Sequence, residues 1–181
     1  MVQINNKEEK MKNKKKGVLD KVYYELGKQQ VDFHVAGTWT KDGERLFTKW
    51  KKYSEAVMPV DFDGTAEDWK DEAYFSQINQ RQILPNELVL DLEEPERIKE
   101  IVDKLKTLSI DSFSVWKTGS RGFHIHIFSD KPIKETTKEF ITQTLGTDVQ
   151  KCSEKCLIAL ENCPHWKTGK PKTDVTEEYY E

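Results

Sequence analysis

Two pairs of ionisable side chains, each pair spaced two residues apart in an apolar segment, are the best candidates for chemistry in this chain. Asp91 and Glu93 lie in ELVLDLE, and His124 and His126 lie in GFHIHIF. Because side chains alternate between the faces of a strand, each pair lies on one face. The solvated face of a sheet would also carry polar residues, but usually Thr, Lys, Ser and Gln. We therefore consider a metal and phosphate site.

The acidic pair suits a divalent cation. Carboxylates such as Asp91 and Glu93 are hard oxygen ligands for Mg²⁺ or Mn²⁺, which usually share them with substrate phosphates. A third carboxylate would complete a two-metal site, and Asp148 and Glu161 are the candidates. A histidine on the neighbouring strand could donate a hydrogen bond to a triphosphate. This combination predicts metal-assisted nucleotidyl transfer on a palm-like sheet.

A glycine-containing turn just before the histidine pair offers further phosphate-binding groups. Gly119 and Gly122 allow a ligand to approach the backbone closely. Between them, Ser120 and Arg121 supply a hydroxyl and a forked guanidinium. The turn is therefore expected to contact the phosphates of the same ligand.

The elements that position these residues follow the order strand, helix, strand, strand, helix, strand. Their expected ranges are 87–93, 95–108, 112–116, 123–128, 133–145 and 156–161. This is the order of the ferredoxin-like unit, which RNA-recognition motifs share. The first and third strands are central neighbours in that topology, and the helices cover one face. The carboxylates and histidines should therefore be adjacent on the open face.

The first half of the chain predicts a small α/β module. Apolar spacing indicates a helix over 17–27, a strand over 31–39 and a helix over 45–57, with a turn at Lys41-Asp42-Gly43. We expect an α+β protein in four parts. These are a flexible lysine-rich tail at 1–16, the N-terminal α/β module at 17–86, a catalytic palm at 87–169 and a C-terminal tail at 170–181.

Composition narrows the class of protein. Of the 181 residues, 36% are hydrophobic and 34% are charged, and the net charge of −3 argues against a uniformly basic nucleic-acid binder. Acidic residues are dense at 61–72. No apolar run approaches the ~20 residues of a membrane helix. Three cysteines are an odd number that fits a reducing compartment, so we expect a cytoplasmic protein without a membrane partner.

The segments resemble the catalytic core of the archaeo-eukaryotic primase superfamily, the small-subunit primases and primase-polymerases. LVLDLE resembles the first motif of that family, a strand that ends in Asp-x-Asp or Asp-x-Glu. TGSRGFHIH resembles the second, Ser-Gly-x-Arg-Gly-aromatic-His-x-His. CLIALENCPHWKTG, which follows Asp148, resembles the third. The resemblance covers 87–169.

This resemblance implies template-directed nucleotidyl transfer by a DNA primase or primase-polymerase. Two Mg²⁺ or Mn²⁺ ions would be held by Asp91, Glu93 and Asp148. The groups implied to contact the incoming nucleotide are Thr118, Ser120, Arg121, His124, His165 and Lys167. Expected partners are a single-stranded DNA template and nucleoside triphosphates, with a helicase or a large primase subunit as a further candidate.

Three departures from the family pattern keep a second hypothesis open. Cys156 and Ala159 stand where the family often has arginines, and Cys163 stands where it has serine. The chain could therefore be a catalytically degenerate relative that binds nucleotide or nucleic acid in a replication or defence complex.

Two other interpretations also remain. Arg121-Gly122-Phe123 is similar to the opening of the third strand of an RNA-recognition motif. Zn²⁺ is a possible cofactor at a site formed by Cys152, Cys156, Cys163 and His165, although their spacing is not a standard one. Core packing is the default for the tryptophans, including Trp69, and Trp166 is the candidate for stacking on a base.

Overall fold

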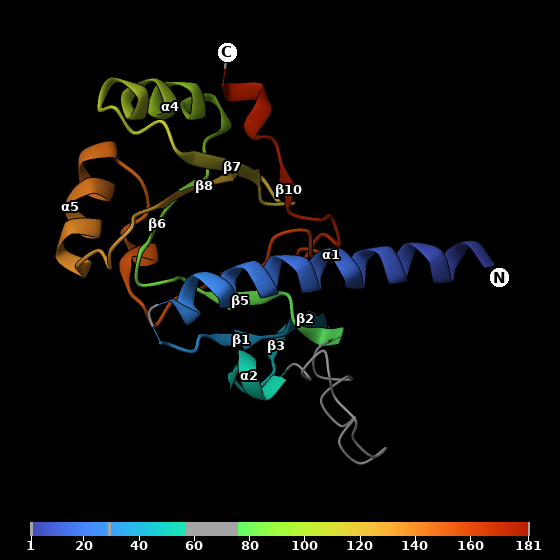
Figure 1. Cartoon of the computed structure of the whole chain (residues 1–181). Coiled ribbons are helices and arrows are strands. Elements are labelled where there is room, and N and C mark those ends of the chain that lie inside the picture. The colour runs from blue at the N-terminus through green and yellow to red at the C-terminus, as the bar shows by residue number, and fades with distance from the viewer. Residues whose placement is uncertain (1, 29, 57–75, 181) are drawn as a thin grey trace.

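The computed structural model describes residues 2–28, 30–56 and 76–180. It is a mixed α/β protein with antiparallel strand pairing: two four-stranded sheets and a two-stranded hairpin (Figure 1). The acidic segment 61–72 and Trp69 lie outside the described residues. Within these three ranges, no helix has the length and apolar character needed to cross a membrane.

The palm sheet has the strand order β10-β7-β8-β6. Its elements are β6 (Glu87–Leu92), η1 (Pro95–Arg97), α4 (Ile98–Thr107), β7 (Phe113–Lys117), β8 (Phe123–Phe128), α5 (Glu135–Leu145) and β10 (Thr173–Asp174). The two helices and the first three strands predicted for the palm are confirmed to within two residues at each end. β8 pairs with both β6 and β7, as predicted, but β6 lies at an edge of the sheet, so the predicted central position of the first strand is wrong.

Apolar alternation builds the core on the helix side of this sheet. Leu90 of β6 and Ile125 of β8 are fully buried against Ile101 and Leu105 of α4. α5 ends at Gly146, whose φ of 67° is the left-handed conformation that glycine adopts readily. The side chains of Asp91 and the two histidines alternate with this apolar set, and they therefore lie on the opposite face.

The fourth predicted strand does not join the palm sheet. β9 (Leu157–Ala159) pairs with β5 (Gln80–Gln82) in an N-terminal sheet of order β4-β1-β5-β9, whose other strands are β1 (His34–Ala36) and β4 (Lys51–Lys52). Ile158 packs with Ile83 in one cluster, and Leu160 packs in the core beside α1. Apolar alternation identified the strand but not the sheet that buries its side chains.

The predicted helix over 45–57 is also wrong within the described residues. β2 (Thr38–Lys41) and β3 (Glu44–Phe47) form a hairpin, followed by β4 and a single helical turn, α2 (Tyr53–Ala56). Asp42 and Gly43 have φ values of 53° and 84°. Positive φ at both central residues suits a two-residue hairpin turn. The chain therefore forms a hairpin around Asp42-Gly43, although the apolar residues after it have helical spacing.

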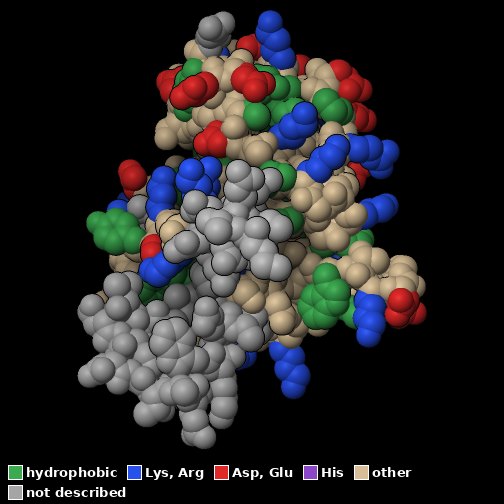
Figure 2. All heavy atoms as spheres, turned by 90° about the vertical axis from the view of Figure 1, so that its right-hand side faces the viewer, with side chains coloured by type: hydrophobic (Ala, Val, Ile, Leu, Met, Phe, Trp, Pro, Cys, Tyr) green, Lys and Arg blue, Asp and Glu red, His purple; other side chains and the backbone are tan. Residues whose placement is uncertain are grey.

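Both predicted tails are structured. α1 (Val2–Gly27) runs through the lysine-rich segment, and it buries Leu19, Val22 and Leu26 in the N-terminal core. At the other end of the chain, β10 joins the palm sheet and η3 (Thr176–Tyr179) follows it. Viewed from the right-hand side of Figure 1, acidic side chains gather over the upper part of the surface and basic ones lie mostly below them (Figure 2).

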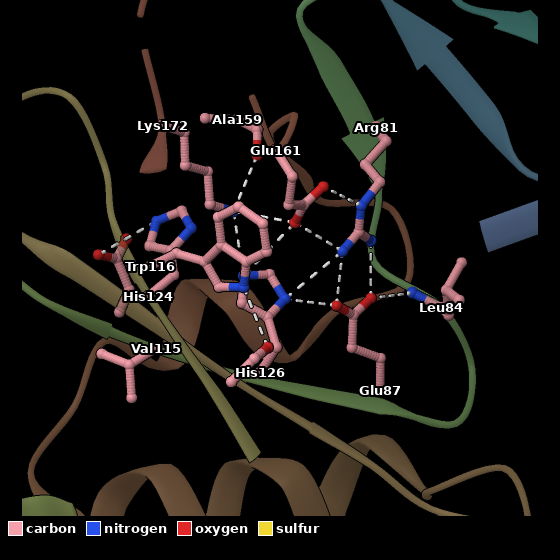
Figure 3. A network of polar contacts seen from close by, with 12 residues as sticks. Arg81, Leu84, Glu87, Val115, Trp116, His124, His126, Ala159, Glu161 and Lys172 are labelled. Atoms are coloured by element: carbon pink, nitrogen blue, oxygen red, sulfur yellow. Dashed lines mark hydrogen bonds and ion pairs between the residues drawn. The ribbon is translucent and has the colours of Figure 1, made fainter. Parts of the chain in front are cut away.

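The palm face predicted to be open is covered in part. A buried charged network joins it to the N-terminal sheet (Figure 3), and Trp116 and Phe128 of the same face line a cleft beside α1. Arg81 of β5 binds both oxygens of Glu87 at 2.7 and 2.8 Å and both oxygens of Glu161 at 2.9 Å. Lys172 lies 3.0 Å from Glu161 and 3.0 Å from Nε2 of His126. Nδ1 of His126 lies 2.6 Å from Glu87.

The network is balanced in charge. Burial and the Lys172 charge lower the pKa of His126, which favours a neutral ring that donates to Glu87 and accepts from Lys172. Arg81 and Lys172 then offset the charges of Glu87 and Glu161. Buried charges are tolerated only when they are paired and hydrogen-bonded in this way.

Replacing Arg81 should therefore destabilise the fold strongly. Arg81→Met leaves two buried carboxylates without their main partner, and we expect the free energy of unfolding to fall by about 3–5 kcal/mol. Urea denaturation followed by circular dichroism measures the change. Lys104→Met, which removes an exposed ion pair with Glu100, is the matched control and should change stability little. Equal losses in the two variants would contradict a network that holds the sheets together.

Candidate functional site

The acidic pair and the first histidine meet where β6 and β8 pair. Asp91 lies directly opposite His124 in the register, with Oδ1 3.5 Å from Nε2. The predicted proximity of these two groups is therefore confirmed. His126 lies one strand step away, opposite Val89, and belongs to the buried network instead.

A cleft of about 280 Å³ opens beside this pair, between the palm sheet and the N-terminal sheet. Seven of the predicted site residues line it: Asp91, Glu93, Thr118, Ser120, Arg121, His124 and His165. Of the primase-type set, Asp148 and Lys167 are not part of this lining. Residues that belong to three separate sequence segments are thus gathered around one volume.

The turn between β7 and β8 is held tightly in place. A Cβ atom at Gly119, where φ is 78°, would lie 2.4 Å from the carbonyl oxygen of Lys170, and one at Gly122 would lie 2.2 Å from that of Leu92. Only glycine fits at these two contacts. Thr118 closes the turn by donating its hydroxyl to the Gly122 carbonyl at 3.0 Å. The loop therefore presents its polar groups from a constrained backbone.

His124 is buried and incompletely hydrogen-bonded. Its side chain is 7% exposed, and its Nδ1 has no hydrogen-bond partner among the described residues. Burial, followed by the charge of Lys172, lowers its pKa well below 6.5, so the ring is neutral near pH 7. A buried nitrogen without a partner is costly. This atom has almost no exposed surface, so the part of the ring that lines the cleft is not this nitrogen.

Negative charge is concentrated around Asp91. Burial raises the pKa of Asp91, and the nearby carboxylates of Asp148 and Glu93 raise it further, against the opposing effect of Lys151. The Nζ of Lys151 lies 3.7 Å from Oδ2 of Asp91. A divalent cation would relieve the repulsion between these carboxylates, and their oxygens are the ligands that Mg²⁺ and Mn²⁺ prefer.

Asp148, the third expected metal ligand, lies close to Asp91 through its backbone, but its carboxylate forms a helix cap instead. The amide of Asp148 donates to the carbonyl of Asp91 at 3.3 Å, while its carboxylate caps η2 (Val149–Cys152) through the amide of Gln150. In the part of the chain that the structure describes, no three His, Cys, Asp or Glu side chains form a ready metal site. The residues present suit a cation whose coordination is shared with substrate phosphates.

The residues considered for zinc are not brought together. Cys163 packs in the core beside α1, and Cys156 packs with Ile83 and Val89. Cys152 contacts the hydroxyl of Thr142 at 3.2 Å. Burial raises the pKa of Cys163 to about 11, whereas zinc binds the thiolate. The structure therefore gives the zinc hypothesis no site.

The RNA-recognition-motif hypothesis also lacks its binding surface. That module stacks bases on aromatic side chains of an exposed sheet face. Here Phe123 packs into the core on the helix side. On the opposite face His126 lies against Arg81, Glu161 and Lys172, and Trp116 and Phe128 line a cleft beside α1 rather than an open sheet surface.

Several cleft residues were not predicted from the sequence as site residues. These are Arg45, Gln80, Lys151, Leu157 and Ile158. Arg45 comes from the hairpin and lies with its Cζ 4.4 Å from the ring centroid of Trp166, which also lines the cleft. No local sequence pattern predicts a contact between Arg45 and Trp166. The turn at Asp42-Gly43 was the one signal that could have placed Arg45 on a hairpin.

No family model and no curated protein matches this chain. Among solved structures, one similar chain is the AEP domain of the primase-polymerase (PrimPol) of cyanophage S-2L. It is 13% identical, with 78% of each chain covered and a TM-score of 0.48. Similarity at this level establishes neither family nor function.

The lowered pKa of His124 predicts a pH dependence of stability. Below about pH 6.5, His124 takes up a proton in the unfolded chain but stays neutral in the folded protein. We therefore expect the free energy of unfolding to fall as the pH drops from about 7.5 to 5.5, and His124→Gln should flatten this slope. Urea denaturation across that range measures it.

His165→Gln serves as the control for this test, because it removes a histidine whose pKa is lowered less. The pKa of His165 is lowered chiefly by partial burial, and by less than that of His124. Its removal should flatten the slope less than His124→Gln does. A slope that His124→Gln leaves unchanged would contradict a buried neutral ring.

Proposed function

We propose that the cleft binds a nucleoside triphosphate and that the protein is a DNA primase or primase-polymerase that adds nucleotides opposite a single-stranded template. One observation carries the proposal. The acidic motif that contains Asp91, the turn at 118–122 and the segment that contains His165 line the same cleft, as a site for metal-bound phosphates requires.

The phosphate end of the substrate would lie against the turn. Arg121 offers a planar fork of donors for phosphate oxygens, and Ser120 offers a hydroxyl. His124 lines the cleft and is neutral, so it would hydrogen-bond a phosphate oxygen without adding charge. His165 borders the same cleft, while Lys167 remains an expected contact from the adjoining loop.

The cations absent from the third motif can come from other elements. Ala159 lines the cleft where the family often has an arginine, and Arg45 of the hairpin and Lys151 of η2 line it too. Two basic side chains from outside the familiar motif would thus add positive charge to the cleft. This supports retained nucleotide binding.

Asp91 and Glu93 would hold Mg²⁺ or Mn²⁺, with Asp148 beside them in the backbone. The bound metal would neutralise charge on the triphosphate and favour attack by a primer hydroxyl on the α-phosphorus, with pyrophosphate leaving. The contribution of the chain is to fix the carboxylates, through the β6–β8 register, next to the groups that orient the phosphates.

A nucleotide-binding domain that does not catalyse transfer is the second candidate. The observation that favours it is the contact of Lys151 with Asp91, because an ammonium group there offsets the charge that a metal would otherwise neutralise. Metal and lysine would then compete for the same carboxylate.

Removing the acidic pair should abolish transfer. In Asp91→Asn with Glu93→Gln, we expect primer synthesis on a single-stranded template with Mn²⁺ or Mg²⁺ to fall by about 100-fold or more, as for lost electrostatic stabilisation of a transition state. Gel analysis of labelled products measures it. Glu94→Gln, which alters an exposed carboxylate paired with Arg97, should retain activity. Undiminished synthesis by the double variant would refute the mechanism.

His124→Ala should separate nucleotide binding from template binding. Loss of one hydrogen bond to a charged phosphate should weaken nucleoside triphosphate binding about tenfold. Binding of a single-stranded oligonucleotide should change less than twofold. Calorimetry with the triphosphate and fluorescence anisotropy with the oligonucleotide provide the two affinities. An equal loss of both would count against the role assigned to this histidine.

A further inference from the structure

A guanidinium held between two aromatic rings extends from the wall of the cleft. The Cζ of Arg45 lies 4.6 Å from the ring centroid of Phe47 and 4.4 Å from that of Trp166. Arg45 and Trp166 line the cleft, whereas Phe47 lies outside its lining. We call these three residues the stacked platform. It leads from the candidate nucleotide site to the outer surface of the hairpin.

The platform is accessible, and its cation has no acidic partner among the described residues. The ring of Phe47 belongs to a residue that is 52% exposed. The Nε of Arg45 donates to the hydroxyl of Thr38 at 3.2 Å, and no acidic side chain in the described ranges forms an ion pair with it. An exposed phenylalanine beside an unneutralised arginine contributes little to folding, which points to a partner.

The hairpin register separates this surface from the rest of the hairpin. Phe47 pairs with Thr38 and Arg45 pairs with Thr40, so Phe47 and Arg45 share one face. Trp39 pairs with Leu46 on the other face and is 38% exposed. The hairpin therefore presents one exposed aromatic residue on the platform side, Phe47, and one on the opposite side, Trp39.

The chemistry of the platform is that of single-stranded nucleic acid recognition. Unpaired bases stack on aromatic rings and guanidinium planes, and their phosphates attract the same cation. Continuity with the cleft strengthens this choice, because a template base must lie close to the nucleotide that pairs with it. A protein partner would have no comparable need for a cation stacked at the mouth of a phosphate site.

We infer that the stacked platform binds single-stranded nucleic acid just outside the cleft, with a base on Phe47 and a backbone phosphate at Arg45. This inference deepens the proposed function by placing the template, and it rests on that function for its choice of partner. The platform and the cleft would then divide recognition between a strand and a free nucleotide.

The test measures binding of a labelled single-stranded DNA oligonucleotide by anisotropy, without nucleotide or metal. Phe47→Ala should weaken this binding about five- to hundredfold, the range found for one lost base-stacking contact, and Phe47→Tyr should restore it. Trp39→Ala is the matched control and should leave the affinity within twofold. Circular dichroism confirms that each variant is folded.

A second variant tests the phosphate contact. Arg45→Met keeps a long apolar side chain between the rings but removes the charge. The slope of log affinity against log salt concentration should become shallower by about 0.7, the value for one phosphate contact on a single strand. An unchanged slope would remove Arg45 from the strand-binding surface.

The remaining outcomes separate the platform from the nucleotide pocket. Equal oligonucleotide affinities for Phe47→Ala and Trp39→Ala would overturn the inference. So would a loss of nucleoside triphosphate binding by Phe47→Ala as large as its loss of oligonucleotide binding, because the ring would then belong to the nucleotide pocket. Oligonucleotide binding that depends on Phe47 in a protein that incorporates no nucleotide would refute the proposed function and leave the platform standing.

Discussion

The pairing of one arginine with two carboxylates from different sheets is the interaction on which the rest of the structure depends. Arg81 extends from the N-terminal sheet, Glu87 belongs to the palm sheet, and Glu161 closely follows β9. None of these charges could remain buried alone. The candidate cleft lies between the same two sheets, so the network that holds them together also fixes the separation of the cleft walls.

The charged network also gives different roles to His124 and His126, which look equivalent in the sequence. His126 has both ring nitrogens occupied, by Glu87 and Lys172, and it acts as a structural link. His124, one strand step away, has Nε2 beside Asp91, while its Nδ1 has no hydrogen-bond partner among the described residues. Strand alternation correctly placed both on one face. Only the position of the second sheet decides that one faces the core network and the other faces the cleft.

This difference marks the limit of what could be predicted from the sequence. Local signals were sufficient for β6, α4, β8 and α5, because apolar periodicity, a first-turn proline and a terminal glycine all act within an element. They were not sufficient for β9, since an alternating strand does not specify which sheet covers it. Arg45 was missed for a related reason. Its place in the cleft depends on a hairpin turn and on contact with Trp166, a residue far away in the sequence.

Charge balance connects the network with the proposed chemistry. The charges of Arg81 and Lys172 offset those of Glu87 and Glu161, so these four residues have little net attraction for a ligand. The cleft is different: Asp91 and Glu93 gather negative charge at one side, next to Lys151, while Arg121 and Arg45 bring positive charge to the cleft from other elements. A triphosphate with its divalent cation carries the complementary pattern, with the metal toward the carboxylates and the phosphate oxygens toward the guanidinium groups. The motif arginines can therefore be absent without removing that complementarity, because the hairpin and η2 supply cations to the same cleft.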